Sequence, residues 1–314
     1  MDFSAALPTF VVTLREGVEA ALVVGIVLAC LKKAQQSKLN SWVYGGVGVG
    51  IAASVLVGVL FTWLIGTLSA ANPKYTPVVE PLLEGVFSVV AIAMLSWMLI
   101  WMTQQAKNLK TEVAGTVTAA LQNINAGWGV FSLIFIAVLR EGFETVLFIA
   151  ANFQQGIMPA LGAVAGLVAA VGVGVLLFRW GVQINIRLFF QVMGVLLLLI
   201  VSGLVVSALK HFNGAIFNLA QIDPQYASLC FYPGSIKDSC ILGPRVWDAA
   251  NILPDKKFPG VVLKALFGYR EKLYLVQGLA YVSFLITVGS LYFRSLGGVA
   301  GATKPATQTP ASGQ

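Results

Sequence analysis

Long apolar stretches dominate this sequence and restrict what it can fold into. A helix of about 20 apolar residues crosses the hydrocarbon core of a bilayer. Such windows occur in about seven places, near 7–31, 42–68, 78–103, 128–151, 157–178, 188–209 and 273–293. Only 11% of the 314 residues are charged, against roughly 25% in soluble domains. The sequence therefore predicts an all-α polytopic membrane protein with seven transmembrane helices, in one domain over residues 1–294.

The distribution of basic residues predicts the orientation of these spans, because Lys and Arg collect in short cytoplasmic loops. They follow the first, third, fifth and seventh spans as Lys32, Lys33, Lys38, Lys107, Lys110, Arg179, Arg187, Arg294 and Lys304. We therefore expect the N-terminus outside and the C-terminus in the cytoplasm, in a plasma membrane or bacterial inner membrane. The tail 295–314, rich in Gly, Ala, Thr and Pro, is expected to be disordered. The net charge of +7 forms no basic stripe, so no nucleic-acid partner is expected.

The long segment 210–272 is placed outside the membrane, because long loops cross regardless of their charge. It contains Cys230 and Cys240 in a stretch rich in turn residues. An external, oxidising compartment favours a small disulfide loop between them. Two free thiols remain the alternative.

A repeated charged motif lies inside two of the apolar windows. Residues 14–19 have the sequence LREGVE, and residues 139–144 have the sequence LREGFE. Each charged residue at a helix centre costs roughly 2.5 to 3.5 kcal/mol to insert, so these residues must face the protein interior or a watery cavity. Buried salt bridges that only fix helix packing are the alternative.

The two motifs are separated by three predicted spans, an odd number, so spans 1–3 and 4–6 would have opposite orientations. This is the signature of an inverted repeat, which brings equivalent positions together near the bilayer midplane. We therefore expect one cation site with the carboxylates of Glu16, Glu19, Glu141 and Glu144. The two arginines would hold and orient these glutamates, and the glycines would let the two motif helices approach closely: Arg15, Arg140, Gly17 and Gly142.

A further acidic element opens the third span, where Glu80 and Glu84 lie one helical turn apart. Glu84 is predicted to contribute to the same metal site, and Glu80 to form its entrance. Carboxylates are hard ligands suited to hard cations. In the third span Met94, Met98 and Met102 recur at helical spacing beside Trp97 and Trp101. We interpret these side chains as packing residues, with a stripe for a soft metal as the alternative. His211, at the outer end of the sixth span, is interpreted as part of a solvated loop, with a relay of cations to the entrance as the alternative.

The paired REGVE and REGFE motifs, the stretch LLEGVFSVVAIAMLSWMLIWM and the segment ALFGY resemble the oxidase-dependent iron transporter family. That family includes fungal high-affinity iron permeases and bacterial EfeU. The resemblance implies seven spans with the N-terminus outside, and import of ferric iron after oxidation by a partner protein. It maps the family's glutamates onto Glu16, Glu19, Glu141 and Glu144, and the third-helix element onto Glu84.

The partners implied by the resemblance are extracytoplasmic: a cupredoxin-like protein and a haem peroxidase in bacteria, or a multicopper oxidase in fungi. Iron is the expected substrate, and no permanently bound cofactor and no enzymatic activity are expected. Two alternatives remain open, namely a carrier for another cation such as lead or manganese, and an intramembrane enzyme with paired carboxylates.

Overall fold

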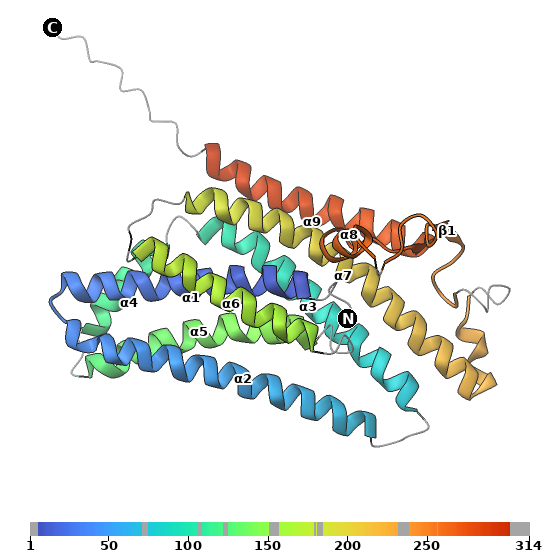
Figure 1. Ribbon diagram of the computed structural model, residues 1–314, viewed down its shortest axis with the longest axis horizontal. Helices are drawn as coiled ribbons and strands as arrows, with labels where there is room; N and C mark the ends of the chain where they lie inside the picture. The colour runs from blue at the N-terminus through green and yellow to red at the C-terminus, as the bar shows by residue number, and fades with distance from the viewer. Residues whose placement is uncertain are drawn as a thin grey trace, which may run out of the picture.

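The computed structural model describes residues 6–70, 75–105, 109–121, 125–150, 157–178, 180, 185–231, 239–255 and 257–301. Within these ranges the chain is mostly helical (Figure 1). Several residues used to predict the topology lie outside them, namely Lys107, Arg179 and Lys304. The last 13 residues of the predicted disordered tail, 302–314, also lie outside.

The long helices follow the predicted apolar windows. They are α1 (Ala6–Lys33), α2 (Asn40–Ala70), α3 (Thr76–Gln105), α5 (Ala126–Ala150), α6 (Met158–Phe178), α7 (Ile186–Ile222) and α9 (Leu275–Gly301). A short helix, α4 (Leu109–Leu121), follows α3 and packs against α1 and α5. A single 3-10 turn, η1 (Ser37–Leu39), precedes α2. Helix α4 therefore lies between the third and fourth apolar windows.

Within the described ranges, α2, α3, α6, α7 and α9 are the five helices long and apolar enough to cross a membrane. The other two long helices, α1 and α5, are those that carry the charged motifs. Large apolar side chains on α2, such as Val55, Val59 and Trp63, are about 60% exposed. Such a surface suits lipid and not water.

Two helices extend beyond the predicted boundaries of their spans. The sixth span was expected to end at 209, but α7 continues to Ile222 because its buried face extends through Ala215. The polar residues that suggested an end, among them Lys210 and His211, lie within the helix. The tail was expected to begin at 295, but α9 continues to Gly301.

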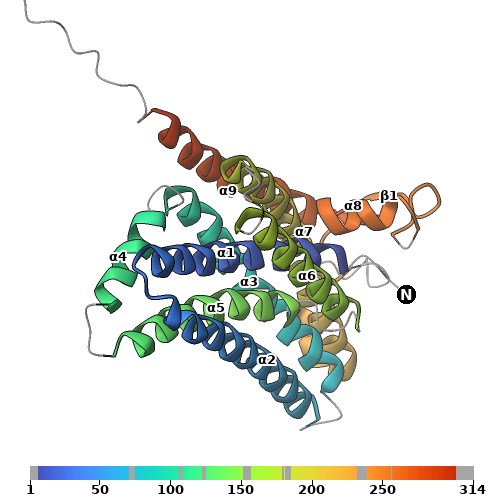
Figure 2. The ribbon, with the colours of Figure 1, turned by 60° about the vertical axis from the view of Figure 1, so that its left-hand side comes forward.

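The helices pack in pairs: α1 lies along α6, α2 along α5, and α3 along α7 (Figures 1 and 2). Helix α9 packs against α7 and α3. Two apolar clusters lie on opposite sides of the charged motifs along α1. The first includes Val11, Val12 and Phe148, toward the N-terminus of α1. The second includes Val27, Leu31, Val130 and Ile134, toward its C-terminus.

Between α7 and α9 the chain forms short elements: η3 (Pro224–Leu229), β1 (Arg245–Asp248), α8 (Gly260–Phe267) and β2 (Lys272–Tyr274). Strands β1 and β2 pair antiparallel. Helix α8 ends at Gly268, whose positive φ of 67° favours glycine. A Cβ on Gly268 would overlap the Gly203 backbone, so these two glycines let the segment pack directly on α7.

Candidate metal site between α1 and α5

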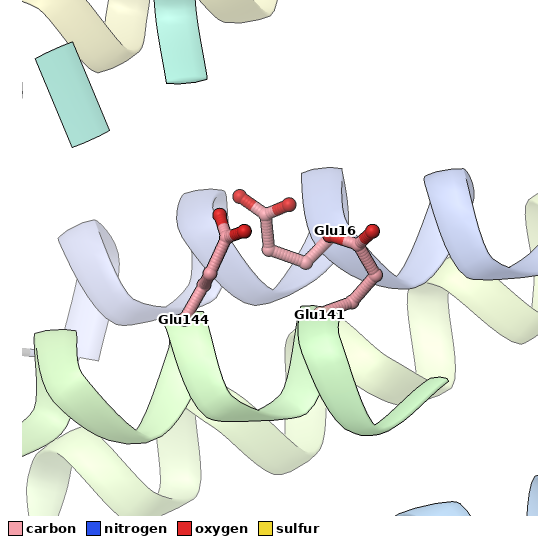
Figure 3. Close-up of side chains that lie close together, drawn as sticks. All are labelled: Glu16, Glu141 and Glu144. Atoms are coloured by element: carbon pink, nitrogen blue, oxygen red, sulfur yellow. The ribbon is translucent and has the colours of Figure 1, made fainter. Parts of the chain in front are cut away.

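Three carboxylates meet where the two charged motifs face each other. Glu16 projects from α1 toward α5, and Glu141 and Glu144 project from α5 toward α1 (Figure 3). One ligand oxygen from each of the three lies within 4.8 Å of the others. The two helices run antiparallel, because Leu31 at the far end of α1 shares an apolar cluster with Val130 near the start of α5. The carboxylates of two motifs that lie 125 residues apart in the sequence are therefore neighbours in the structure.

Two carboxylate oxygens at this site, Oε2 of Glu16 and Oε2 of Glu141, are buried without a donor group among the described residues. The two carboxyl groups lie close enough to hydrogen-bond to each other when one of them is protonated. A buried carboxylate oxygen without a partner is costly. A cation between these helices would supply the missing interaction.

Arg15 supports the α1 half of the site. Its Nη1 lies 2.6 Å from Glu16 Oε1, and its Nη2 lies 3.1 Å from Glu19 Oε1. Nη1 also donates to the Met98 sulfur of α3 at 3.2 Å. Arg15 is therefore held by three side chains and is almost fully buried. Glu19 lies on the Arg15 side and interacts electrostatically with Glu144, but it is not among the three converging carboxylates.

Arg140 supports the α5 half less firmly. Its Nε lies 3.7 Å from Glu141 Oε1 and 3.6 Å from Glu144 Oε1, and its side chain is 46% exposed. The guanidinium lies over the Trp101 ring of α3, 4.9 Å from the ring centroid. The two motifs have the same sequence pattern, but only Arg15 is deeply buried.

The motif glycines do not bring α1 and α5 together, as the sequence analysis expected. A Cβ on Gly17 would lie 2.6 Å from the Ala170 Cβ of α6, and one on Gly142 would overlap Ser54 of α2. The glycines therefore lie against the helix behind each motif helix. The reason is geometric, because residues one position apart on a helix do not share a face, and the carboxylates occupy the inner face.

Glu84 is not in the three-carboxylate group. It is buried on α3, where its Oε2 lies 2.7 Å from His211 Nδ1 of α7. Met98, which contacts Arg15, lies 14 residues further along α3, a rise of about 21 Å. Glu80 lies one further turn away and is partly buried. The structure thus places the acidic element of α3 well apart from the motif carboxylates.

Sequence reasoning missed three contacts. Met98 and Trp101 were interpreted as packing residues, yet they contact Arg15 and Arg140. His211 was assigned to a solvated loop, yet it lies on α7 against Glu84. Met98 and Trp101 lie three residues apart, so both face the same side of α3. That shared face was the available signal.

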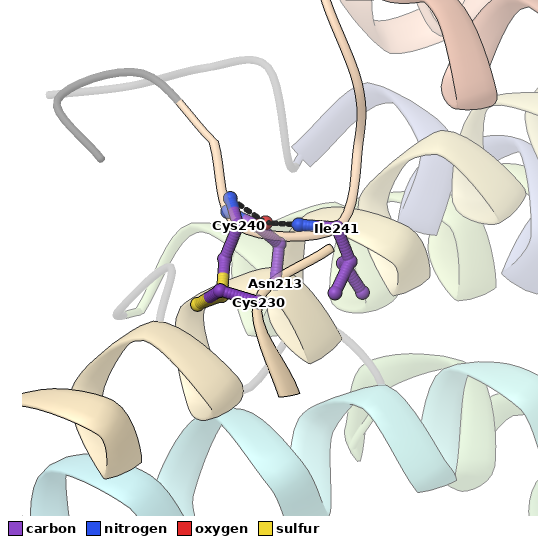
Figure 4. Close-up of a disulfide and its surroundings, with 4 residues drawn as sticks. All are labelled: Asn213, Cys230, Cys240 and Ile241. Atoms are coloured by element: carbon purple, nitrogen blue, oxygen red, sulfur yellow. Dashed lines mark hydrogen bonds between the residues drawn. A yellow bond between two sulfur atoms is a disulfide. The ribbon is translucent and has the colours of Figure 1, made fainter. Parts of the chain in front are cut away.

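Cys230 and Cys240 form a disulfide (Figure 4). Asn213 of α7 lies beside it, and its Oδ1 accepts hydrogen bonds from the backbone N–H groups of Cys240 and Ile241, both at 2.9 Å. These contacts hold the disulfide loop on the last turns of α7. Cys30 of α1 is a free thiol.

Comparison with known proteins identifies a family for this chain. The model of the iron permease FTR1 family matches residues 6–297. The chain is 48% identical over 309 residues to the uncharacterized protein slr0964 of Synechocystis, covering 98% of this chain and 99% of that protein. No solved structure matches the chain.

Two permeases are also similar in sequence to this chain. The ferrous iron permease EfeU of Escherichia coli O6:K15:H31 is 31% identical over 267 residues, which cover 83% of this chain and 86% of that protein. The ferrous iron permease EfeU of Yersinia pseudotuberculosis is 29% identical over 295 residues, 93% of each chain. The matched family is one of permeases. The resemblance noted in the sequence is confirmed, and this chain belongs to the iron permease FTR1 family.

Proposed function

We propose that this protein imports iron across the membrane by binding it at the carboxylates of Glu16, Glu141 and Glu144. The observation that carries the proposal is their convergence, with one ligand oxygen from each residue within 4.8 Å of the others. The buried Oε2 atoms of Glu16 and Glu141 have no donor group among the described residues apart from each other's carboxyl group. Glu19 lies beside them as a fourth carboxylate. Four ionised carboxylates and two guanidinium groups leave a formal charge of −2, which favours a multivalent cation.

The proposal includes seven spans arranged as an inverted repeat, α1 to α3 and α5 to α7, with α9 as the seventh. The packing supports this arrangement. If α1, α2 and α3 correspond to α5, α6 and α7, then the α1–α6 pair corresponds to the α5–α2 pair, and both pairs are present. The α1–α5 and α3–α7 pairs then lie on the pseudo-two-fold axis. We place the N-terminus outside and the C-terminus in the cytoplasm, from the distribution of Lys and Arg.

The proposal also includes the form of the iron. Carboxylates are hard ligands, and they favour the ferric ion, delivered after oxidation by an extracytoplasmic partner. The resemblance suggests a cupredoxin-like protein with a haem peroxidase, or a multicopper oxidase. The names of the two permease relatives specify ferrous iron, so ferrous and ferric iron should be supplied separately in the same uptake assay.

The test is uptake of radioactive iron into cells or proteoliposomes by Glu16→Gln and Glu141→Gln variants. A charge-assisted contact contributes about 1.5–3 kcal/mol, so either change should weaken iron binding about 10- to 150-fold. Asp248→Asn is a matched control, because Asp248 lies on exposed β1 and pairs only locally with Arg245. Uptake equal to the wild type in both Gln variants, at equal amounts in the membrane, would refute the proposal.

Another cation remains the second candidate, because three carboxylates also suit other hard or borderline ions. Lead and manganese should be added as competitors in the same assay. If iron is the substrate, a tenfold excess of either ion leaves most iron uptake intact. Complete inhibition by one of them would identify that ion as the better substrate of this site.

A further inference from the structure

The outer halves of α3 and α7 are joined along an antiparallel seam. Asn218 Nδ2 donates a hydrogen bond to the Pro77 carbonyl at 2.6 Å. About two turns further along, a Cβ on Gly85 would lie 2.9 Å from the Phe212 ring. Gly85 therefore has no room for a side chain, and its absence lets α7 approach α3 closely. This approach brings the preceding residue of each helix, Glu84 and His211, into contact.

Glu84 and His211 present two ligand atoms to the same point. Glu84 Oε2 lies 2.7 Å from His211 Nδ1, an ion pair when the imidazole is protonated, and it has no other partner among the described residues. Glu84 is 6% exposed, whereas the His211 side chain is 26% exposed. With bonds of about 2.1 Å, donors at this separation subtend roughly 80° at a metal ion, close to the 90° of an octahedral site.

This pair is separate from the motif carboxylates. It lies about 21 Å along α3 from Met98, the α3 residue that contacts Arg15. The intervening turns of α3 contribute Ala91 and Leu95 to the same apolar cluster as Val12 of α1. An ion at Glu84 therefore does not share a ligand with Glu16.

We propose that Glu84 and His211 form an outer site where a transition-metal cation first binds, before it reaches the motif carboxylates. This inference rests on the proposed function and its orientation, which put the start of α3 outside. A carboxylate alone binds Ca²⁺ and Mg²⁺, whereas imidazole suits iron and other first-row transition metals. His211 therefore selects against the two hard cations. Glu80, one turn further out on the face of Glu84, extends the acidic face toward the solvent.

Binding at this site is tested on the full chain in detergent, purified without a polyhistidine tag, with Glu16→Gln and Glu141→Gln present to remove the central site. Mn²⁺ alone is the probe, and pulsed EPR detects nitrogen bound to it. His211 is the single histidine of the chain, so a ¹⁴N imidazole coupling identifies it. The coupling should be lost in His211→Gln, and Glu84→Gln should weaken Mn²⁺ binding tenfold or more.

Lys210→Gln, next to His211 on α7, is the matched control and should keep the coupling. Absence of any ¹⁴N coupling in the parent protein, or its persistence in His211→Gln, would overturn the inference. This result is independent of the proposed function: failure of the outer site leaves iron uptake dependent on Glu16, whereas failure of the proposed function leaves the EPR signal unchanged.

Cation selectivity gives a second readout, which should stay the same if His211 has only a structural role. In His211→Glu the site keeps two ligands but has oxygen donors alone, so iron uptake should persist and become inhibited by millimolar Ca²⁺. In His211→Gln the KM for iron should rise several-fold at an unchanged maximum rate. Equal insensitivity to Ca²⁺ in the wild type and His211→Glu would contradict the proposed selection.

Discussion

The contact between Gly17 of α1 and Ala170 of α6 permits a quantitative test of the packing behind the metal site. A Cβ on Gly17 would lie 2.6 Å from the Ala170 Cβ, whereas carbon atoms pack at about 3.5–4.0 Å. Gly17→Ala therefore forces the two helices about 1 Å apart. Overpacking of this kind costs about 1–3 kcal/mol.

A second substitution separates this steric effect from any other effect of the first. Ala170→Gly removes the methyl group that Gly17→Ala would meet, and alone it costs about 1 kcal/mol through lost burial and greater backbone freedom. In the double variant the methyl group has moved from α6 to α1, so the clash is relieved. The two substitutions should then show a favourable coupling of about 1–3 kcal/mol.

The measurement is the free energy of unfolding in detergent micelles, followed by circular dichroism, for the four proteins of this cycle. Gly48→Ala on α2 is the control, because a Cβ there meets nothing within 4 Å. It should change the stability little. The close contact of α1 with α6 would be refuted if the Gly17→Ala and Gly48→Ala proteins had equal free energies of unfolding. It would also be refuted if the losses of the two single variants, Gly17→Ala and Ala170→Gly, simply added in the double variant.

Two further predictions follow from the ion pairs and the disulfide. Arg15→Met should destabilise the protein by about 3–5 kcal/mol because it leaves buried carboxylates uncompensated. Arg140→Met should cost about 0–1 kcal/mol, because the Arg140 contacts are longer and its side chain is half-exposed. Equal losses in unfolding free energy for the two variants would contradict this asymmetry. Reduction of the Cys230–Cys240 disulfide, which closes a loop with a sequence separation of 10, should cost about 3 kcal/mol. Cys30→Ser should not alter that difference between oxidised and reduced protein, and an unfolding transition insensitive to reductant would contradict the estimate.

The sequence was sufficient to predict the helices and the meeting of the two motifs. Charged residues inside apolar helices are so costly that Glu16 and Glu141 were expected to face the protein interior, and the structure brings them close together. Helical spacing then put Arg15 within reach of Glu19, and the structure shows that ion pair. The apolar windows predicted the helices well, because hydropathy alone determines which segments suit the bilayer.

What the sequence did not reveal depends on helix rotation and neighbours. Gly17 and Gly142 suggested close approach, but a glycine does not indicate which helix approaches it. The end of α7 was misplaced because Lys210 and His211 look like the start of a loop. In the structure their helix continues, and α3 packs against it through Glu84 and Gly85. Such contacts between distant segments leave no periodic pattern in one sequence.

The two apolar clusters on either side of the motif carboxylates also have an electrical consequence. Moving an ion from water into a medium of low dielectric constant costs of order 20 kcal/mol. The layers around Val12 on one side and Leu31 on the other therefore oppose the entry of a bare ion to the site from either end of α1. If the motif carboxylates lie across the membrane as we propose, these layers should limit the leak of protons and sodium ions that four acidic groups would otherwise allow.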